Sequence, residues 1–132
     1  MYQLTAIFNK ICLNDVLQDL CERKIEGITV IDVVGKGGIG FKEEGGTPDL
    51  DPKVKIEIIL SNDEYKESAK EAIRANTQDL GHGAGKMWVI QVLEVERIRT
   101  GEKNEEALTQ SHISKKMGVS ESHFTIIDTP AS

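Results

Sequence analysis

The sequence predicts an α+β fold in which strands and helices follow in the order β-α-β-β-α-β. Four segments carry the β-branched or alternating residues that are typical of strands, and two segments repeat apolar residues at helical spacing. Turn-forming residues separate these segments. A chain of 132 residues can bury one core without disulfides or a structural metal. We therefore expect a single core domain.

The pattern begins with a strand followed by a helix. Residues 2–8 alternate loosely between polar and apolar side chains, which predicts a strand. Asn14 is a good helix cap, and apolar residues recur behind it at three- and four-residue intervals. These residues, which predict one buried helix face, are Val16, Leu17, Leu20, Cys21 and Ile25.

Two strands then follow, over residues 28–34 and 53–60, because both segments are rich in β-branched residues. Side chains alternate faces along a strand, so Lys53, Lys55 and Glu57 should share one face of the third strand. The opposite, buried face should carry Val54, Ile56, Ile58 and Leu60.

The second helix is predicted over residues 63–78, where Ser61 and Glu64 have the spacing of a capping box. Its apolar positions are Tyr65, Ala69, Ala72 and Ile73. The fourth strand is predicted over residues 86–100, and its nearly continuous apolar start favours a central position. The complete order predicts a ferredoxin-like fold, with two helices on one face of a four-stranded antiparallel sheet.

Two loops and a tail lie outside this core. Residues 35–52 hold six glycines and two prolines, which predicts a large projecting loop. Residues 79–86 hold three glycines before Lys86. The predicted domain spans residues 1–106, and residues 107–132 form a C-terminal extension.

Composition limits the function classes. The net charge of −6 gives no general attraction to nucleic acid or to an anionic membrane. No apolar run approaches the ~20 residues that span a bilayer, and no leader pattern opens the chain, so we expect a cytoplasmic protein. Cys12 and Cys21 lack metal-type spacing and should be reduced thiols. No nucleophile and base form a catalytic constellation, so no enzyme is expected.

The cations of the fourth strand are the first candidate binding residues. Alternating glycines can turn successive N–H groups toward one anion, so the glycine-rich loop before Lys86 is either a phosphate-binding nest or an ordinary turn. Arg97 and Arg99 are two residues apart and should point the same way, toward a ligand or toward acidic partners. Since the predicted strand separates Lys86 from the arginines by about 35 Å, only a neighbouring subunit can unite them.

Three motifs in this order resemble the PII nitrogen-regulatory signal-transduction proteins: "KVKIEI" from Lys53, "GAGK" ending at Lys86 and "ERIRTGE" from Glu96. The resemblance covers residues 1–106. It implies a homotrimer that binds an adenine nucleotide (ATP, ADP or AMP) in clefts between subunits, without deciding whether magnesium accompanies it. It also implies regulation of a target protein or membrane transporter through the loop at residues 35–52, the T-loop, in nitrogen, carbon or transport metabolism.

The resemblance also implies site residues. Gly83, Gly85 and Lys86 would hold the phosphates from one subunit, while Arg97 and Arg99 reach in from the next. The positions that surround the adenine and ribose, or that start the T-loop, are Ile7, Thr29, Gly35, Lys36, Gly37 and Ile59.

Three departures from the family pattern modify these expectations. Gly38 and Ile39 stand where relatives commonly have a glutamine that helps to hold magnesium and 2-oxoglutarate, so the usual 2-oxoglutarate response is not predicted. The loop has no tyrosine, so uridylylation is not expected, and Ala84 replaces a frequent aspartate. These departures indicate a divergent, PII-like branch.

Other interpretations stay open. One is a ferredoxin-like trimer that serves as an assembly or metal-response module without nucleotide. Another is a helix-turn-helix at residues 112–124, although a β-branched run and Pro130 follow it, which favours a helix and an added edge strand. His82, His112 and His123 lack the helix-type spacing of zinc ligands.

Overall fold

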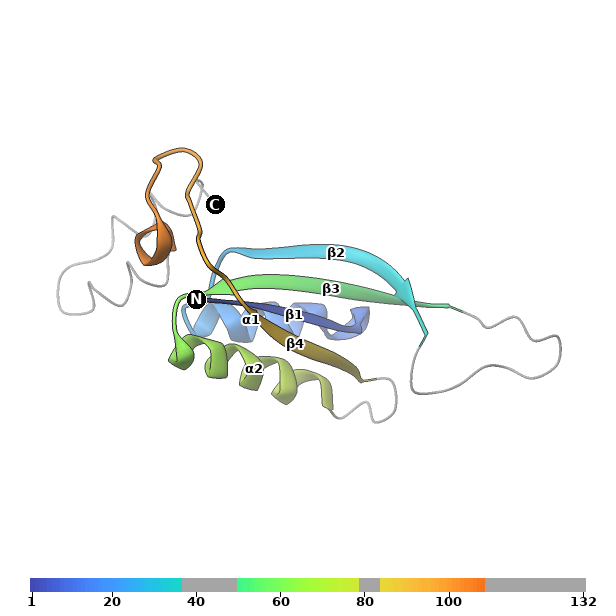
Figure 1. The fold of residues 1–132 in the computed structure, drawn as a ribbon. Coiled ribbons are helices and arrows are strands. Elements are labelled where there is room, and N and C mark those ends of the chain that lie inside the picture. The colour runs from blue at the N-terminus through green and yellow to red at the C-terminus, as the bar shows by residue number, and fades with distance from the viewer. Residues whose placement is uncertain (37–49, 79–83, 109–132) are drawn as a thin grey trace, which may run out of the picture.

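The computed structural model describes residues 1–36, 50–78 and 84–108. Helices α1 (Leu13–Glu22) and α2 (Asp63–Thr77) lie side by side on one face of a four-stranded sheet (Figure 1). A short 3-10 helix, η1 (Lys10–Cys12), leads into α1. The predicted β-α-β-β-α-β order and the ferredoxin-like α+β fold are confirmed.

The sheet is antiparallel throughout, with the strand order β2-β3-β1-β4. The strands are β1 (Tyr2–Asn9), β2 (Ile28–Gly35), β3 (Asp51–Leu60) and β4 (Gly85–Gln91). The first three agree with the predicted strands to within two residues at each end. Because β2 and β3 remain paired as far as Gly35 and Asp51, the first and last residues of the predicted loop belong to strands.

The prediction for the fourth strand was wrong in length and in position. Strand β4 pairs only with β1 within the described ranges, and Tyr2 lies opposite Gln91 at the end of this pairing. The apolar run at the start of this strand combines side chains from both faces of β4. Met87 and Val89 pack on the core, whereas Trp88 and Ile90 lie on the opposite face, where 40% and 52% of their surface is exposed.

The core lies between the sheet and the two helices. Strand alternation directs one set of side chains in β1 and β3 toward the helices, as predicted for β3. These residues are Leu4, Ala6, Phe8, Val54, Ile56, Ile58 and Leu60, and all are essentially inaccessible to water. Val16, Leu20 and Ile25 cover them from α1 and its C-terminal end, and Ala69, Ala72 and Ile73 from α2.

Both predicted helix caps were displaced. Asn9 caps η1, where its Oδ1 accepts a hydrogen bond from the Ile11 N–H at 3.0 Å, and Asn14 lies inside α1. Asn62 caps α2 by accepting from the Tyr65 N–H at 2.9 Å, whereas Ser61 is buried one residue earlier. The extended backbone of Asn62 suits a cap, which places its side-chain oxygen over the first helical turn.

The predicted buried face of the first helix was too wide, because Cys21 is exposed and Leu17 is half-buried. Cys12 is buried, and both cysteines are free thiols, as predicted. Desolvation raises the pKa of the Cys12 thiol, with a smaller contribution from Asp15. This burial keeps Cys12 in its uncharged form.

A polar clamp joins the outer surfaces of α1 and α2. The Arg23 guanidinium contacts Asp19 Oδ1 at 2.8 Å, the Ser68 carbonyl oxygen at 3.2 Å and Glu71 Oε1 at 3.3 Å. Asn76 Nδ2 donates to the other oxygen of Asp19 at 2.9 Å. The hydrogen bond from Arg23 lowers the pKa of the Asp19 carboxyl, and Asn76 adds to this effect.

The clamp predicts a pH-dependent contribution of Asp19 to stability. Because the folded-state pKa is depressed, the contribution is present above the unfolded value of about 3.9 and is lost as the pH falls through the folded value. We expect Asp19→Asn to lower the free energy of unfolding by about 1 kcal/mol at pH 7. The difference from the parent should be smaller at pH 3 than at pH 7, because the unfolded-state carboxyl is largely protonated at pH 3.

Urea unfolding at both pH values measures this difference. Glu22→Gln is the matched control, because Glu22 lies exposed on the same helix, and within the described ranges its side chain accepts a hydrogen bond from Gln18 alone. An equal loss for Asp19→Asn at pH 7 and pH 3 would contradict the assigned role of the carboxylate.

Candidate functional site

The face of the sheet opposite the helices carries the predicted site residues of the strands, and we call it the open face. Strand register defines two neighbouring rows of side chains across it. One row is Ile31, Lys55, Ile7 and Lys86. The other row is Thr29, Glu57, Thr5 and Trp88. Apolar and charged side chains are therefore mixed on a surface that no described helix covers.

One group of predicted site residues lies at the end of the sheet from which the T-loop leaves. Lys86 is the cross-strand neighbour of Ile7, and Gly85 lies opposite Phe8. Gly35 ends β2, and Lys36 follows it. Gly37 and Gly83 lie outside the described residues. The structure thus brings Ile7, Gly35, Lys36, Gly85 and Lys86 to one end of the sheet.

The remaining predicted residues lie progressively nearer the other end. Thr29 is one row beyond Ile7, and Ile59, which pairs with Gln3, is one row further. After β4 the chain rises from this far end on the side of the open face (Figure 1). This segment carries Arg97 and Arg99, so these arginines lie away from Lys86, as predicted. The predicted continuous strand between them is not observed, because β4 ends at Gln91.

Residues 93–103 form a tight turn with two short arms, which we call the hairpin. The Arg97 N–H donates to the Glu102 carbonyl at 2.8 Å, and the Gly101 N–H donates to the Arg97 carbonyl at 2.8 Å. The backbones of Glu96 and Lys103 pair as an isolated antiparallel β-bridge below the turn. Gly101 has φ of +76°, a left-handed conformation that glycine adopts at little cost.

The hairpin separates the two arginines, so the prediction that they share one strand face was wrong. Arg97 is 7% exposed, and its Nη2 donates to the Ala107 carbonyl at 2.9 Å. Its Nε lies 3.4 Å from Glu102 Oε1, which agrees with the alternative of an acidic partner. Arg99 is exposed at the turn. In the single chain, Arg97 therefore holds the hairpin together, whereas Arg99 is presented to solvent.

Gly85 has a steric role that the sequence did not reveal. Its φ is +116°, and an added Cβ would lie 2.1 Å from the Ile7 carbonyl oxygen and 2.9 Å from the Phe8 Cα. Only glycine allows this close approach of β4 to β1. Because the next residue is Lys86, this contact also fixes the position of that lysine beside Ile7.

Two further features of the open face were not among the predicted site residues. Lys55 Nζ lies 3.5 Å from Glu57 Oε2, so an ion pair occupies the middle of the face. Trp88 is the only tryptophan of the chain and lies on the same face as Lys86, two residues further along β4. The sequence did contain an indication of this residue, because an aromatic side chain two positions after the candidate cation Lys86 shares its face of a strand.

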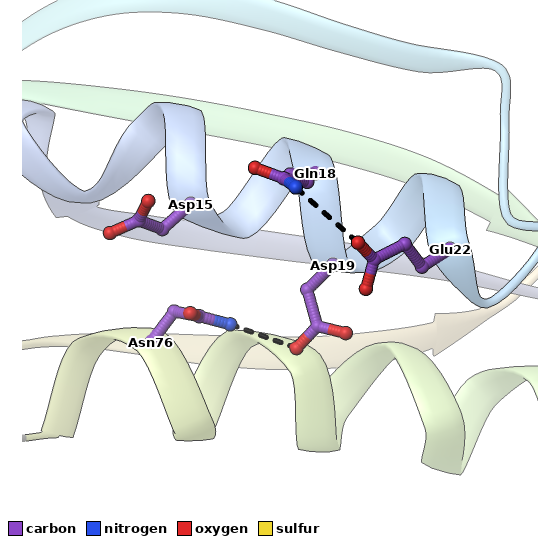
Figure 2. A pocket seen from close by; sticks show the side chains of 5 residues that line it. All are labelled: Asp15, Gln18, Asp19, Glu22 and Asn76. Carbon is purple, nitrogen blue, oxygen red and sulfur yellow. Dashed lines mark hydrogen bonds between the residues drawn. The ribbon is translucent and has the colours of Figure 1, made fainter.

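A separate pocket of about 280 Å³ lies on the outer surface of the two helices (Figure 2). Its lining comprises Asp15, Gln18, Asp19, Glu22 and Asn76. Figure 2 shows the amides of Gln18 and Asn76 directed at the carboxylates of Glu22 and Asp19, with hydrogen bonds of 3.3 and 2.9 Å. Three carboxylates disfavour a phosphate here, so we assign this pocket to the clamp between the helices.

Other kinds of site find no support in the described ranges. Among residues 1–36, 50–78 and 84–108, no three histidine, cysteine or acidic side chains are grouped to hold a metal ion. In the same ranges no helix has the length and apolar character needed to cross a bilayer. All three histidines and the suggested helix-turn-helix lie outside these ranges.

Comparison with known proteins agrees with the motifs. The profile of the family described as "P-II: Nitrogen regulatory protein P-II" matches residues 1–102. The "Nitrogen regulatory protein P-II 1" of Methanothermobacter thermautotrophicus is 37% identical over 113 residues, which cover 82% of this chain and 97% of that protein. The "Nitrogen regulatory protein P-II" of Pasteurella multocida is 38% identical over 117 residues, covering 82% of this chain and all of that protein.

The "Nitrogen regulatory protein P-II 1" of Escherichia coli is 35% identical over 117 residues, again covering 82% of this chain and all of that protein. The family profile spans both strand pairs, both helices and the hairpin as far as Glu102. A family match over most of the chain agrees with the fold and with the placement of the motifs. The chain belongs to the P-II family of nitrogen regulatory proteins, which are signal-transduction regulators.

Proposed function

We propose that this chain acts in the cytoplasm as a homotrimeric regulator that binds an adenine nucleotide in each cleft between subunits. Gly83, Gly85 and Lys86 of one subunit hold the phosphates, and Arg99 enters from the hairpin of the next. Ile7, Gly35, Lys36 and Gly37 contact the base, the ribose or the phosphates from the first subunit. Thr29 and Ile59 contribute from the second.

The observation that carries this proposal is the separation of the two cationic elements. Lys86 lies at the T-loop end of the open face, and the hairpin rises from the opposite end on the same side of the sheet. One subunit therefore offers two incomplete halves of an anion site. A second subunit supplies the missing half at each end, as the family resemblance implies.

The described geometry changes the role of Arg97 in this proposal. Its buried guanidinium is committed to Ala107 and Glu102, so it orients the hairpin, whereas Arg99 makes the direct charge-assisted contact. Such contacts contribute about 1.5–3 kcal/mol each, and a few of them supply much of the ~8 kcal/mol of micromolar affinity. The entropic cost of binding reduces this sum.

Regulation runs through the connection between Gly35 and Asp51, which joins two strands that border the site. A nucleotide that contacts Gly35 and Lys36 binds one arrangement of this connection better than another, and it shifts the population by that difference in affinity. The target is a protein or membrane transporter of nitrogen, carbon or transport metabolism. Residues 107–132 form an extension beyond the region matched by the family profile, for which we propose a regulatory role.

Calorimetric titration with ATP, ADP and AMP, each with and without Mg²⁺ and 2-oxoglutarate, tests the proposal. We expect micromolar binding of at least one nucleotide and no response to 2-oxoglutarate, because Gly38 and Ile39 replace the family's glutamine. Tighter ATP binding in 2-oxoglutarate would contradict the argument from these two residues. No binding across the panel would leave the alternative, an assembly module without nucleotide.

Substitution of Arg99 measures its contact with the ligand. We expect Arg99→Ala to weaken nucleotide binding about 10- to 100-fold, since one charge-assisted contact is lost. The oligomeric mass should not change. Arg74→Ala is the matched control, because Arg74 is an exposed arginine on α2, on the other side of the sheet. Equal affinities for the two variants would exclude Arg99 from the site.

A further inference from the structure

The helix-facing side of β2 is only partly covered. Alternate residues of β2 lie on this side of the sheet, in register with the core-facing residues of β3. Ile28, at the start of the strand, packs against the core. Further along, Val30 and Val34 are 40% and 64% exposed, and the exposed Asp32 lies between them. We call Val30, Asp32 and Val34 the outer strip.

The outer strip is fixed in shape and balanced in charge. Strand β2 is paired with β3 along its whole length, and Val30 and Val34 are about 13 Å apart along it. Asp32 Oδ1 lies 3.2 Å from Lys10 Nζ, so the acidic group of the strip has a cationic partner on η1. Such a surface accepts an uncharged, extended apolar segment without leaving a carboxylate unpaired.

The chain itself contains a segment of matching character. Residues 124–127 read Phe-Thr-Ile-Ile, which is uncharged and rich in β-branched side chains. They belong to the C-terminal extension, outside the described residues and beyond the region that the family profile matches. Burial of these side chains against an accessible apolar surface is favourable, because it removes apolar area from water.

We propose that Phe124 and Ile126 dock on Val30 and Val34 of the same chain. Alternate residues of an extended segment lie on one side and are about 6–7 Å apart, so both side chains contact the strip together. Phe124 follows Leu108, where the described chain ends, by sixteen residues, which reach about 53 Å when extended. This reach exceeds the sheet, which measures about 26 Å along β2 and about 14 Å from β4 across to β2.

The docked segment borders the start of the T-loop. Val34 directly precedes Gly35 and Lys36, so a segment that packs on Val34 restrains the end of β2 from which the T-loop leaves. Docking and release then favour different arrangements of the T-loop by the difference in contact energy between them. This inference rests on the regulatory role proposed for residues 107–132, and it does not require nucleotide binding.

Disulfide trapping in the full chain tests the contact. Val30→Cys and Ile126→Cys are combined with Cys21→Ser, which removes the exposed native thiol, while the buried Cys12 is kept. The matched control replaces Val30→Cys with Ile31→Cys, because Ile31 is also 40% exposed but lies on the open face. With oxidised glutathione, we expect the Val30→Cys protein to form its bridge at least about tenfold faster than the control.

Hydrogen exchange supplies a second measurement without introduced thiols. Phe124→Asp should release the extension from the outer strip, so the amides of residues 28–36 should exchange at least about threefold faster. Val119→Asp is the matched control, because it adds the same charge to the extension outside residues 124–127 and should leave the exchange of β2 unchanged. Circular dichroism checks that both variants keep the fold of the parent.

The outcomes separate this inference from nucleotide binding. On a non-reducing denaturing gel the bridged product should keep the mass of one chain, and a doubled mass would overturn docking within the chain. Equal bridging by the Val30→Cys and Ile31→Cys proteins, or equal exchange in the two aspartate variants, would also overturn it, even in a protein that binds nucleotide normally. Selective bridging in a protein that binds no nucleotide would support docking and overturn the nucleotide site.

Discussion

Gly85→Ala is expected to cause the largest loss of stability of any single methyl addition among the described glycines. The new Cβ would lie 2.1 Å from the Ile7 carbonyl oxygen, which is backbone of a central strand and cannot move without disturbing the sheet. The left-handed φ of +116° adds strain for any residue with a side chain. We expect a loss of about 3–5 kcal/mol, or a fall in Tm of more than about 10 °C.

Gly101→Ala is the matched control for this prediction. Gly101 also has positive φ, at +76°, but nothing lies within 4 Å of an added Cβ. Its substitution should therefore cost only backbone strain, about 1 kcal/mol. Thermal unfolding followed by circular dichroism compares the two variants. If both variants lost the same stability, strain alone would explain Gly85, and the close approach of β4 to β1 would have no energetic role.

Substitution of Arg97 is expected to have the second largest effect, a loss of local stability in the hairpin. Arg97→Ala removes the 2.9 Å hydrogen bond to the Ala107 carbonyl and the contact with Glu102. Buried charge-assisted hydrogen bonds contribute about 1.5–3 kcal/mol, so local opening of the hairpin should become roughly 10- to 100-fold more frequent. Hydrogen exchange at the Gly101 and Asn104 amides, whose N–H groups close the hairpin, measures this opening.

Arg99→Ala distinguishes orientation of the hairpin from contact with the ligand. Arg99 is exposed, so its removal should leave exchange of the hairpin amides unchanged and still weaken nucleotide binding. Arg97→Ala should accelerate exchange and weaken binding together. If Arg97→Ala weakened binding while the exchange rates stayed the same, Arg97 would contact the ligand directly, and its buried position in the single chain would not be the one used in the assembly.

Local sequence patterns predicted the strands and helices whose buried faces pack against other parts of the same chain. Alternation in β3 identified its buried face because each apolar residue there meets the helices of the same subunit. Helical spacing likewise found Val16 and Leu20. The caps were displaced because each helical segment has two candidate cap residues near its start, Asn9 and Asn14 at the first and Ser61 and Asn62 at the second. Only the backbone conformation selects between them.

The sequence patterns gave wrong predictions for β4 and for the two arginines, whose side chains lie partly outside the core of the single chain. Trp88 and Ile90 made β4 resemble a central strand, although among the described strands it lies at the edge of the sheet, with apolar side chains on its open face. Arg97 and Arg99 had strand spacing, but the turn at Gly101 assigns them opposite environments. The roles that the family resemblance gives to these residues depend on a neighbouring subunit, which local propensity does not describe, and they stay a prediction.

The alternation of β3 has a consequence for insertions and deletions. Val54, Ile56 and Ile58 face the core, while Lys55 and Glu57 face the open surface. Inserting one residue within the strand would exchange the two sets, placing charges in the core and apolar groups outside. We therefore expect a one-residue insertion or deletion within β3 to cost much more stability than one in the connection between Gly35 and Asp51.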